Sequence, residues 1–195
     1  MTTTNLNTAA FDRLRWPIFD DISNIQVMDD PDCLTTTLSP FLDHSIAEEP
    51  ATDACLVEML FNVGALLEFE GLDFEPPDDL VVSRDDGGTV TVGDVVAQLH
   101  EYFNVHKQDI LQCLAPVYNT RQSTTDGKRE TVIEASGNLY QAIPEGKKVF
   151  FNGFGAGIIE PHAPVVEVEL WCEGQDGRSA EYYWKSRASP LEYPL

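Results

Sequence analysis

The sequence has few basic residues and no apolar run long enough to cross a membrane. It holds 12 Lys and Arg against 33 Asp and Glu in 195 residues, a formal net charge of −21. Such an excess of carboxylates repels phosphate backbones and anionic lipid headgroups. No segment approaches the roughly 18 consecutive apolar residues of a membrane-spanning helix. We therefore expect no direct contact with nucleic acid or membrane. The charge suits solubility in a crowded compartment first, and attraction of a basic partner or imitation of nucleic acid second. We expect another protein as partner, for which a basic one is an option, and the oligomeric state stays open.

The cysteines show no metal-binding pattern. The four thiols are widely dispersed, at Cys33, Cys55, Cys113 and Cys172. A structural zinc site usually needs a closely spaced CxxC pair, which is missing. Residues 1–7 also lack the basic start and apolar core of a secretory signal peptide. We expect a cytoplasmic protein with reduced thiols and without a metal or cofactor.

The sequence also contains no recognisable catalytic motif. The histidines are scattered, at His44, His100, His106 and His162, and none belongs to an HExxH or similar motif. The glycine-rich run 153–157 follows a predicted strand but lacks the following helix that would bind phosphate, so it predicts a bend or bulge. We assign no catalytic residue, and the sequence leaves open whether the protein is an enzyme.

Length and composition suit one folded domain with an N-terminal extension. An apolar content of 43% is enough for a substantial core. Residues 1–50 combine acidic residues with proline in turn-like surroundings, which predicts an irregular segment wrapped on the rest. Residues 51–195 are predicted to form a single α+β domain.

The clearest pattern lies in residues 80–103. Two β-branched runs flank Asp85-Asp86-Gly87-Gly88, which predicts a hairpin. Thr91, with Asp94 three residues later, is placed to cap a helix. One apolar stripe then recurs at helical spacing, at Val92, Val95, Val96, Leu99 and Phe103. We predict a hairpin that leads directly into an amphipathic helix over residues 92–103.

The remaining patterns predict strands around this helix. The patterns predict strands over residues 147–152, 165–172 and 180–185, and they predict that the last two pair as a hairpin. Residues 55–67 fit a helix or a strand equally well, residues 109–114 a short helix, and residues 119–130 a loop. The predicted fold is α+β: a mostly antiparallel sheet of about four to six strands, packed on one face by one main amphipathic helix.

Three motifs carry a resemblance to a known family. They are residues 91–95, the pair Leu99-His100 and residues 149–154. In this order they resemble an uncharacterised fungal domain family of unknown function, over about residues 40–172. The resemblance implies that residues 55–63 form a strand. It implies no catalytic residue.

Basic and aromatic residues gather in the C-terminal part and suggest a partner surface. In the predicted hairpin of residues 165–172 and 180–185, Trp171 and Tyr183 would lie on the outward face. Lys147 and Lys148 begin a neighbouring strand. An exposed aromatic patch of this kind is typical of protein recognition. We predict a non-catalytic protein-binding or assembly module that uses these four residues.

Two other functions stay open at this point. An enzyme or small-ligand carrier would need a polar-lined pocket between the sheet and the helix. An acidic mimic of nucleic acid, blocking a basic partner, would need two rows of carboxylates at phosphate-like spacing.

Overall fold

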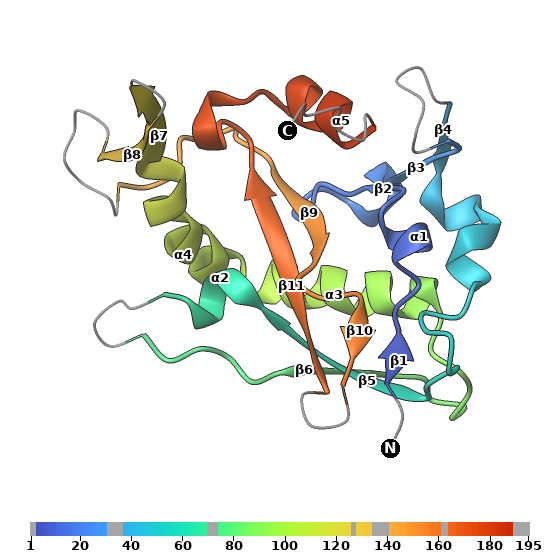
Figure 1. Ribbon diagram of the computed structural model, residues 1–195. Coiled ribbons are helices and arrows are strands. Elements are labelled where there is room, and N and C mark those ends of the chain that lie inside the picture. The colour runs from blue at the N-terminus through green and yellow to red at the C-terminus, as the bar shows by residue number, and fades with distance from the viewer. Residues whose placement is uncertain are drawn as a thin grey trace.

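A mixed four-stranded sheet forms the centre of the fold (Figure 1). The computed structural model describes residues 3–30, 37–69, 74–125, 128–133, 141–160 and 164–188. The sheet has the order β6-β5-β11-β9, formed by Leu80–Ser83, Glu58–Val63, Val165–Cys172 and Val149–Phe154. Only the β11–β5 pair is parallel, while the β5–β6 and β11–β9 pairs are antiparallel. The predicted α+β class is confirmed.

Strands β9 and β11 lie where the sequence predicts strands, with an irregularity in their pairing. Val168 pairs with Phe154, but Leu170 pairs with Phe151, so the register shifts by one residue between these pairs. Gly153 takes a positive φ of 129° at this point, which glycine adopts without strain. The bulge predicted for the glycine-rich run is confirmed.

The ambiguous segment 55–67 forms strand β5, followed by the single turn of α2 (Gly64–Leu67). Met59, Phe61 and Val63 face the core, and the residues between them are more exposed. This alternation is typical of a strand with one buried face. The strand alternative is confirmed.

Helix α3 (Val92–Val105) begins at the predicted capping box. The Asp94 amide donates to Thr91 Oγ1 at 3.2 Å, and the Thr91 amide donates to Asp94 Oδ2 at 2.8 Å. Two N–H groups at the helix start are thus satisfied. The whole predicted stripe is buried, at Val92, Val95, Val96, Leu99 and Phe103.

The first strand and the turn predicted before α3 are present, but the two runs do not pair as a hairpin. Strand β6 pairs with β5 and not with the residues after the turn, because β5 offers it four consecutive partners. After the turn at Gly87, the Val90 amide donates to the Leu56 carbonyl at 2.8 Å, and the Val90 carbonyl accepts from the Ala51 amide at 3.0 Å. The second run therefore forms its backbone hydrogen bonds with residues 51–56 and is not a strand.

The first 50 residues hold only short elements, but they belong to the core. Strands β2, β3 and β4 form a small antiparallel sheet, and β1 pairs with β10 (Ile158–Ile159). The elements of this region are β1 (Thr4–Asn5), α1 (Thr8–Phe11), β2 (Leu14–Arg15), η1 (Ile22–Asn24), β3 (Gln26–Met28), β4 (Leu38–Pro40), η2 (Phe41–Asp43) and η3 (Ser45–Glu48). Phe11, Leu14 and Trp16 share one hydrophobic cluster with the sheet and α3.

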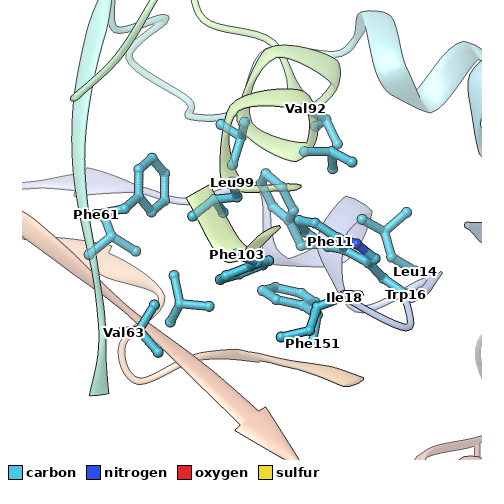
Figure 2. Close-up of a cluster of buried hydrophobic side chains, with 14 of the residues drawn as sticks. Phe11, Leu14, Trp16, Ile18, Phe61, Val63, Val92, Leu99, Phe103 and Phe151 are labelled. Carbon is cyan, nitrogen blue, oxygen red and sulfur yellow. The ribbon is translucent and has the colours of Figure 1, made fainter. Parts of the chain in front are cut away.

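Aromatic rings fill the space between the sheet, α3 and the N-terminal segment (Figure 2). Trp16 lies with its ring centroid 5.4 Å from that of Phe103 and 5.3 Å from that of Phe151. These side chains are at most 1% exposed. The interface between the sheet and α3 is closely packed where the structure describes it.

Residues 107–133 differ from the prediction. Helix α4 (Lys107–Asn119) extends through Pro116, beyond the short helix predicted for residues 109–114. The predicted loop 119–130 is wrong, since β7 (Thr120–Thr125) and β8 (Lys128–Ile133) pair as a hairpin. Residues 120–131 are all polar or glycine, so the alternation of apolar and polar residues that marks a strand is missing over most of the hairpin.

The strand predicted over residues 180–185 is also wrong, because this segment forms helix α5 (Ala180–Ala188). The turn before it, η4 (Gln175–Gly177), does not close a hairpin. Ser179 Oγ accepts from the Tyr182 amide at 3.2 Å, which caps the helix. Glu181 in the first turn and Lys185 and Arg187 in the last turn suit the helix dipole. These terminal signals outweigh the β propensity of the adjacent aromatics.

The capping box of α3 gives a test of the fold. We expect Thr91→Ala to lower the free energy of unfolding by about 1 kcal/mol, because it removes a helix cap. The measurement is the urea midpoint at constant m value. Thr89→Ala is the matched control, since that half-buried hydroxyl makes no side-chain hydrogen bond with the described residues. Equal losses in both variants would contradict the role of the box.

Candidate functional site

Two of the predicted partner-binding residues, Trp171 and Tyr183, are buried. Their rings stack with centroids 4.1 Å apart and planes 1° apart, and each residue is only 5% exposed. With Phe150 and Trp184 they form an aromatic cluster apart from the main core. The expected exposed patch is wrong because Tyr183 lies on helix α5, which covers the sheet at Trp171.

Polar contacts hold α5 against the bulge in β9. The Tyr183 hydroxyl donates to Asn152 Oδ1 at 2.5 Å. Arg187 donates to the Asn152 carbonyl at 2.5 Å and to Asp12 Oδ1 at 3.3 Å. Burial raises the pKa of the Tyr183 phenol above its ordinary value, so this hydroxyl stays a donor near neutral pH. These contacts indicate a structural role for the aromatic cluster.

The other two predicted residues, Lys147 and Lys148, line a groove of about 570 Å³. We call it the lysine groove. Its lining includes three lysines, two carboxylates and three large apolar side chains, at Lys107, Lys147 and Lys148, at Asp20 and Glu145, and at Phe19, Leu111 and Ile143. It therefore combines ammonium groups with apolar wall residues. Lys147 and Lys148 keep their candidate role, and Lys107 joins them.

Local backbone geometry brings the lysines together. The Lys147 amide donates to the Pro144 carbonyl at 3.3 Å, which closes a turn with Gly146 at a positive φ of 84°. Lys148 directly precedes β9, and its Nζ lies 2.5 Å from Asp20 Oδ2. Lys107 comes from the start of α4, with its ammonium 5.0 Å from the centroid of the Phe19 ring.

The charges of the groove are only partly compensated. Lys148 pairs with Asp20, but Lys107 and Lys147 form no ion pair with any carboxylate of the described residues. By contrast, Arg84, Lys185 and Arg187 each form an ion pair with a carboxylate. A lysine in the first turn of a helix also opposes the helix dipole, so Lys107 does not stabilise α4 by its position.

A second hollow, of about 360 Å³, adjoins the lysine groove and shares Pro17, Asp20 and Lys148 with it. We call it the Arg15 pocket. Arg15 and its cross-strand partner Gln26 lie on one side, and Phe150 and Trp184 also line it. Arg15 was not among the site residues predicted from the sequence. The available signal was the presence of two arginines, Arg13 and Arg15, inside the apolar run of residues 11–19.

A third hollow, of about 560 Å³, lies at the other end of α3. Its cation is compensated, because Arg84 lies 2.9 Å from the Asp86 carboxylate and 3.3 Å from the Asp94 carboxylate. Among the described residues, no group of three or more His, Cys, Asp or Glu side chains is placed to hold a metal ion.

The described histidines make local contacts. His44 Nδ1 accepts from the Ile46 amide at 3.1 Å, and His100 Nε2 lies 2.8 Å from the Asp20 carbonyl oxygen. His106 lies 3.7 Å from the Asp109 carboxylate. His162 lies outside the described residues. These contacts are structural, and they form no acid–base pair facing a hollow.

The comparisons with known proteins add no relative. The chain matches no protein-family model, no curated protein and no solved structure. The resemblance to a fungal domain family therefore stays a prediction. No helix in the described parts of the chain has the length and apolar character needed to cross a membrane.

The thiols give a test of burial. Cys55 is exposed, while Cys113 and Cys172 are buried, and Cys33 lies outside the described residues. Burial raises the pKa of Cys113 to about 11 and that of Cys172 to about 12. An unfolded thiol ionises near its ordinary value of 9.0, so the unfolded chain releases these protons first. The fold therefore loses stability as the pH rises from about 9 towards 12.

We expect iodoacetamide at pH 8 to modify Cys55 in the folded protein but to spare Cys113 and Cys172 until denaturant is added. Thiolates are the reactive species, and the buried thiols stay protonated. Peptide mapping by mass spectrometry measures each site. Modification of Cys172 as fast as Cys55 without denaturant would contradict the packing of β11.

Proposed function

We propose that the protein is a non-catalytic protein-binding module whose lysine groove docks a partner segment that carries both acidic and apolar side chains. The observation that carries this proposal is the pair of ammonium groups, Lys107 and Lys147, without an ion-pair partner among the described residues. They lie beside the apolar Phe19, Leu111 and Ile143.

Charge balance supports an acidic segment. The chain has 33 acidic and 12 basic residues, so a lysine placed at random on its surface has carboxylates nearby. Asp20 and Glu145 also line the groove, but three lysines against these two carboxylates leave one positive charge, which is complementary to a carboxylate from outside. Exposed ion pairs are worth about 0.2–1 kcal/mol each, so they set orientation and specificity more than affinity.

The apolar wall supplies the affinity in this proposal. Leu111 and Ile143 are partly buried against the core, with surface left to cover. Burying one Leu or Phe side chain of a partner contributes about 1.5–3 kcal/mol. A segment with alternating acidic and large apolar residues therefore fits the groove better than a uniformly acidic one.

The whole-chain charge of −21 still favours a partner that is basic overall, because long-range attraction acts on net charge. Such a partner can carry a short acidic docking segment. The basic partner and the cytoplasmic location stay predictions. An enzyme or carrier with a pocket between the sheet and α3 is less favoured, since the described side chains there are closely packed.

The test is selection of dodecamer peptides displayed on phage against the full chain. We expect enriched peptides that combine Asp or Glu with Leu, Ile or Phe. For a synthetic copy of such a peptide, Lys107→Gln combined with Lys147→Gln should raise the Kd by roughly 2–30-fold, because two exposed ion pairs are lost.

Lys185→Glu is the matched control, because it changes the net charge by the same two units at a side chain that is 63% exposed. It should leave the Kd within about twofold. The proposal fails when the enriched peptides carry no acidic residue, or when the control weakens binding as much as the groove variant. Copurification of a metabolite instead, seen by native mass spectrometry, would favour the carrier.

A further inference from the structure

The side chain of Arg15, in the Arg15 pocket, forms no hydrogen bond or ion pair with the part of the chain that the structure describes. Arg15 Nε is buried and makes no hydrogen bond, and no carboxylate of the described residues pairs with the guanidinium. Its contact is with Trp184, whose ring centroid lies 5.3 Å from Arg15 Cζ. Burial lowers the pKa of Arg15, which reflects the cost of holding a charge there uncompensated.

The fold holds this side chain in place. Arg15 pairs with Gln26 across the β2–β3 ladder, and Pro17 bridges to Phe150 of β9. Phe150 and Trp184 meet edge to face, with centroids 5.4 Å apart. The guanidinium therefore lies against a rigid aromatic wall, and its planar fork loses little freedom when it binds an anion.

The charge around the pocket matches a single negative charge. Arg15 and Lys148 each contribute one positive charge, and Asp20 contributes one negative charge. The balance of the three groups is one positive charge. A carboxylate neutralises it, whereas a phosphate dianion would leave an excess negative charge beside Asp20 in a chain of −21.

The pocket also offers room and amide donors. Its volume of about 360 Å³ exceeds the need of a bare carboxylate. Phe150 and Trp184 are only 5% and 7% exposed, so they add little apolar surface, while the exposed Asn24 and Gln26 side chains bring amide N–H donors. Room for a side chain, with donors around its carboxylate, favours Glu.

We propose that the Arg15 pocket binds one glutamate side chain of the partner's docking segment, with Arg15 as the bidentate donor that selects a carboxylate. This inference rests on the proposed function, because the pocket shares Pro17, Asp20 and Lys148 with the lysine groove. It adds a specificity determinant to the partner segment: a glutamate that enters the Arg15 pocket while neighbouring residues of the same segment occupy the lysine groove.

The test is titration of the full chain with three small probes. Binding is measured by two-dimensional NMR, from the shifts of the Trp184 indole N–H and the Arg15 Nε–H. N-acetylglutamate α-amide should give saturable shifts, and its neutral isostere N-acetylglutamine α-amide should not. Inorganic phosphate at pH 7 should bind more weakly than the glutamate probe. Equal shifts from the glutamine probe, or tighter binding of phosphate, would overturn the assignment.

Variants locate the site. Arg15→Gln should weaken the glutamate probe at least about tenfold, and Arg15→Lys should weaken it less, because it keeps the charge but loses the fork. Lys185→Gln, with the same change of net charge as Arg15→Gln, should have no effect. Thermal unfolding confirms that each variant is folded. Unchanged binding in both Arg15 variants would overturn the proposal.

The two proposals fail separately. Lys107→Gln with Lys147→Gln should leave the glutamate probe bound while it removes peptide docking. A glutamate probe that binds normally, with no acidic peptide ever selected, would overturn the protein-binding function alone. Peptides that depend on Lys107 and Lys147 but ignore Arg15 would overturn the Arg15 assignment alone.

Discussion

The fold depends on the burial of the apolar stripe of α3 against the sheet and the N-terminal segment. Phe103 from α3, Trp16 from the N-terminal segment and Phe151 from β9 meet at one point, with ring centroids within 5.4 Å of Trp16 (Figure 2). Fully burying each such aromatic contributes a few kcal/mol. Because three distant parts of the chain meet there, this contact fixes where the N-terminal segment and β9 lie relative to each other.

The candidate site follows from that arrangement. Successive residues of a strand face opposite sides, so Phe151 points into the core while Phe150 points to the outer face under α5. The N-terminal segment lies along the edge of β9 through Trp16, Pro17 and Ile18. Arg15, one residue earlier, therefore lies beside Phe150, and Asp20 meets Lys148. The lysine groove forms where this edge meets the start of α4, and the Arg15 pocket forms where it meets β3 and α5.

Features set by a few neighbouring residues were predicted correctly from the sequence. Features set by packing between distant segments were not. The capping box at Thr91 and the alternation in β11 are contained within a few residues, and both are as expected. The conformation of residues 180–188 depends on packing over Trp171, and adjacent aromatics satisfy a strand pattern as readily as a helix surface. The site was half predicted: Lys147 and Lys148 are adjacent in sequence, but Lys107 and Arg15 join them only through the fold.

The central claim is that binding takes place at the lysine groove and the Arg15 pocket, and not between the sheet and α3. Hydrogen–deuterium exchange of the full chain, with and without a selected acidic peptide, tests it most directly. We predict new protection in residues 15–20, 107–111 and 143–150, with residues 58–63 and 92–103 unchanged. Protection confined to residues 58–63 and 92–103 would contradict the account.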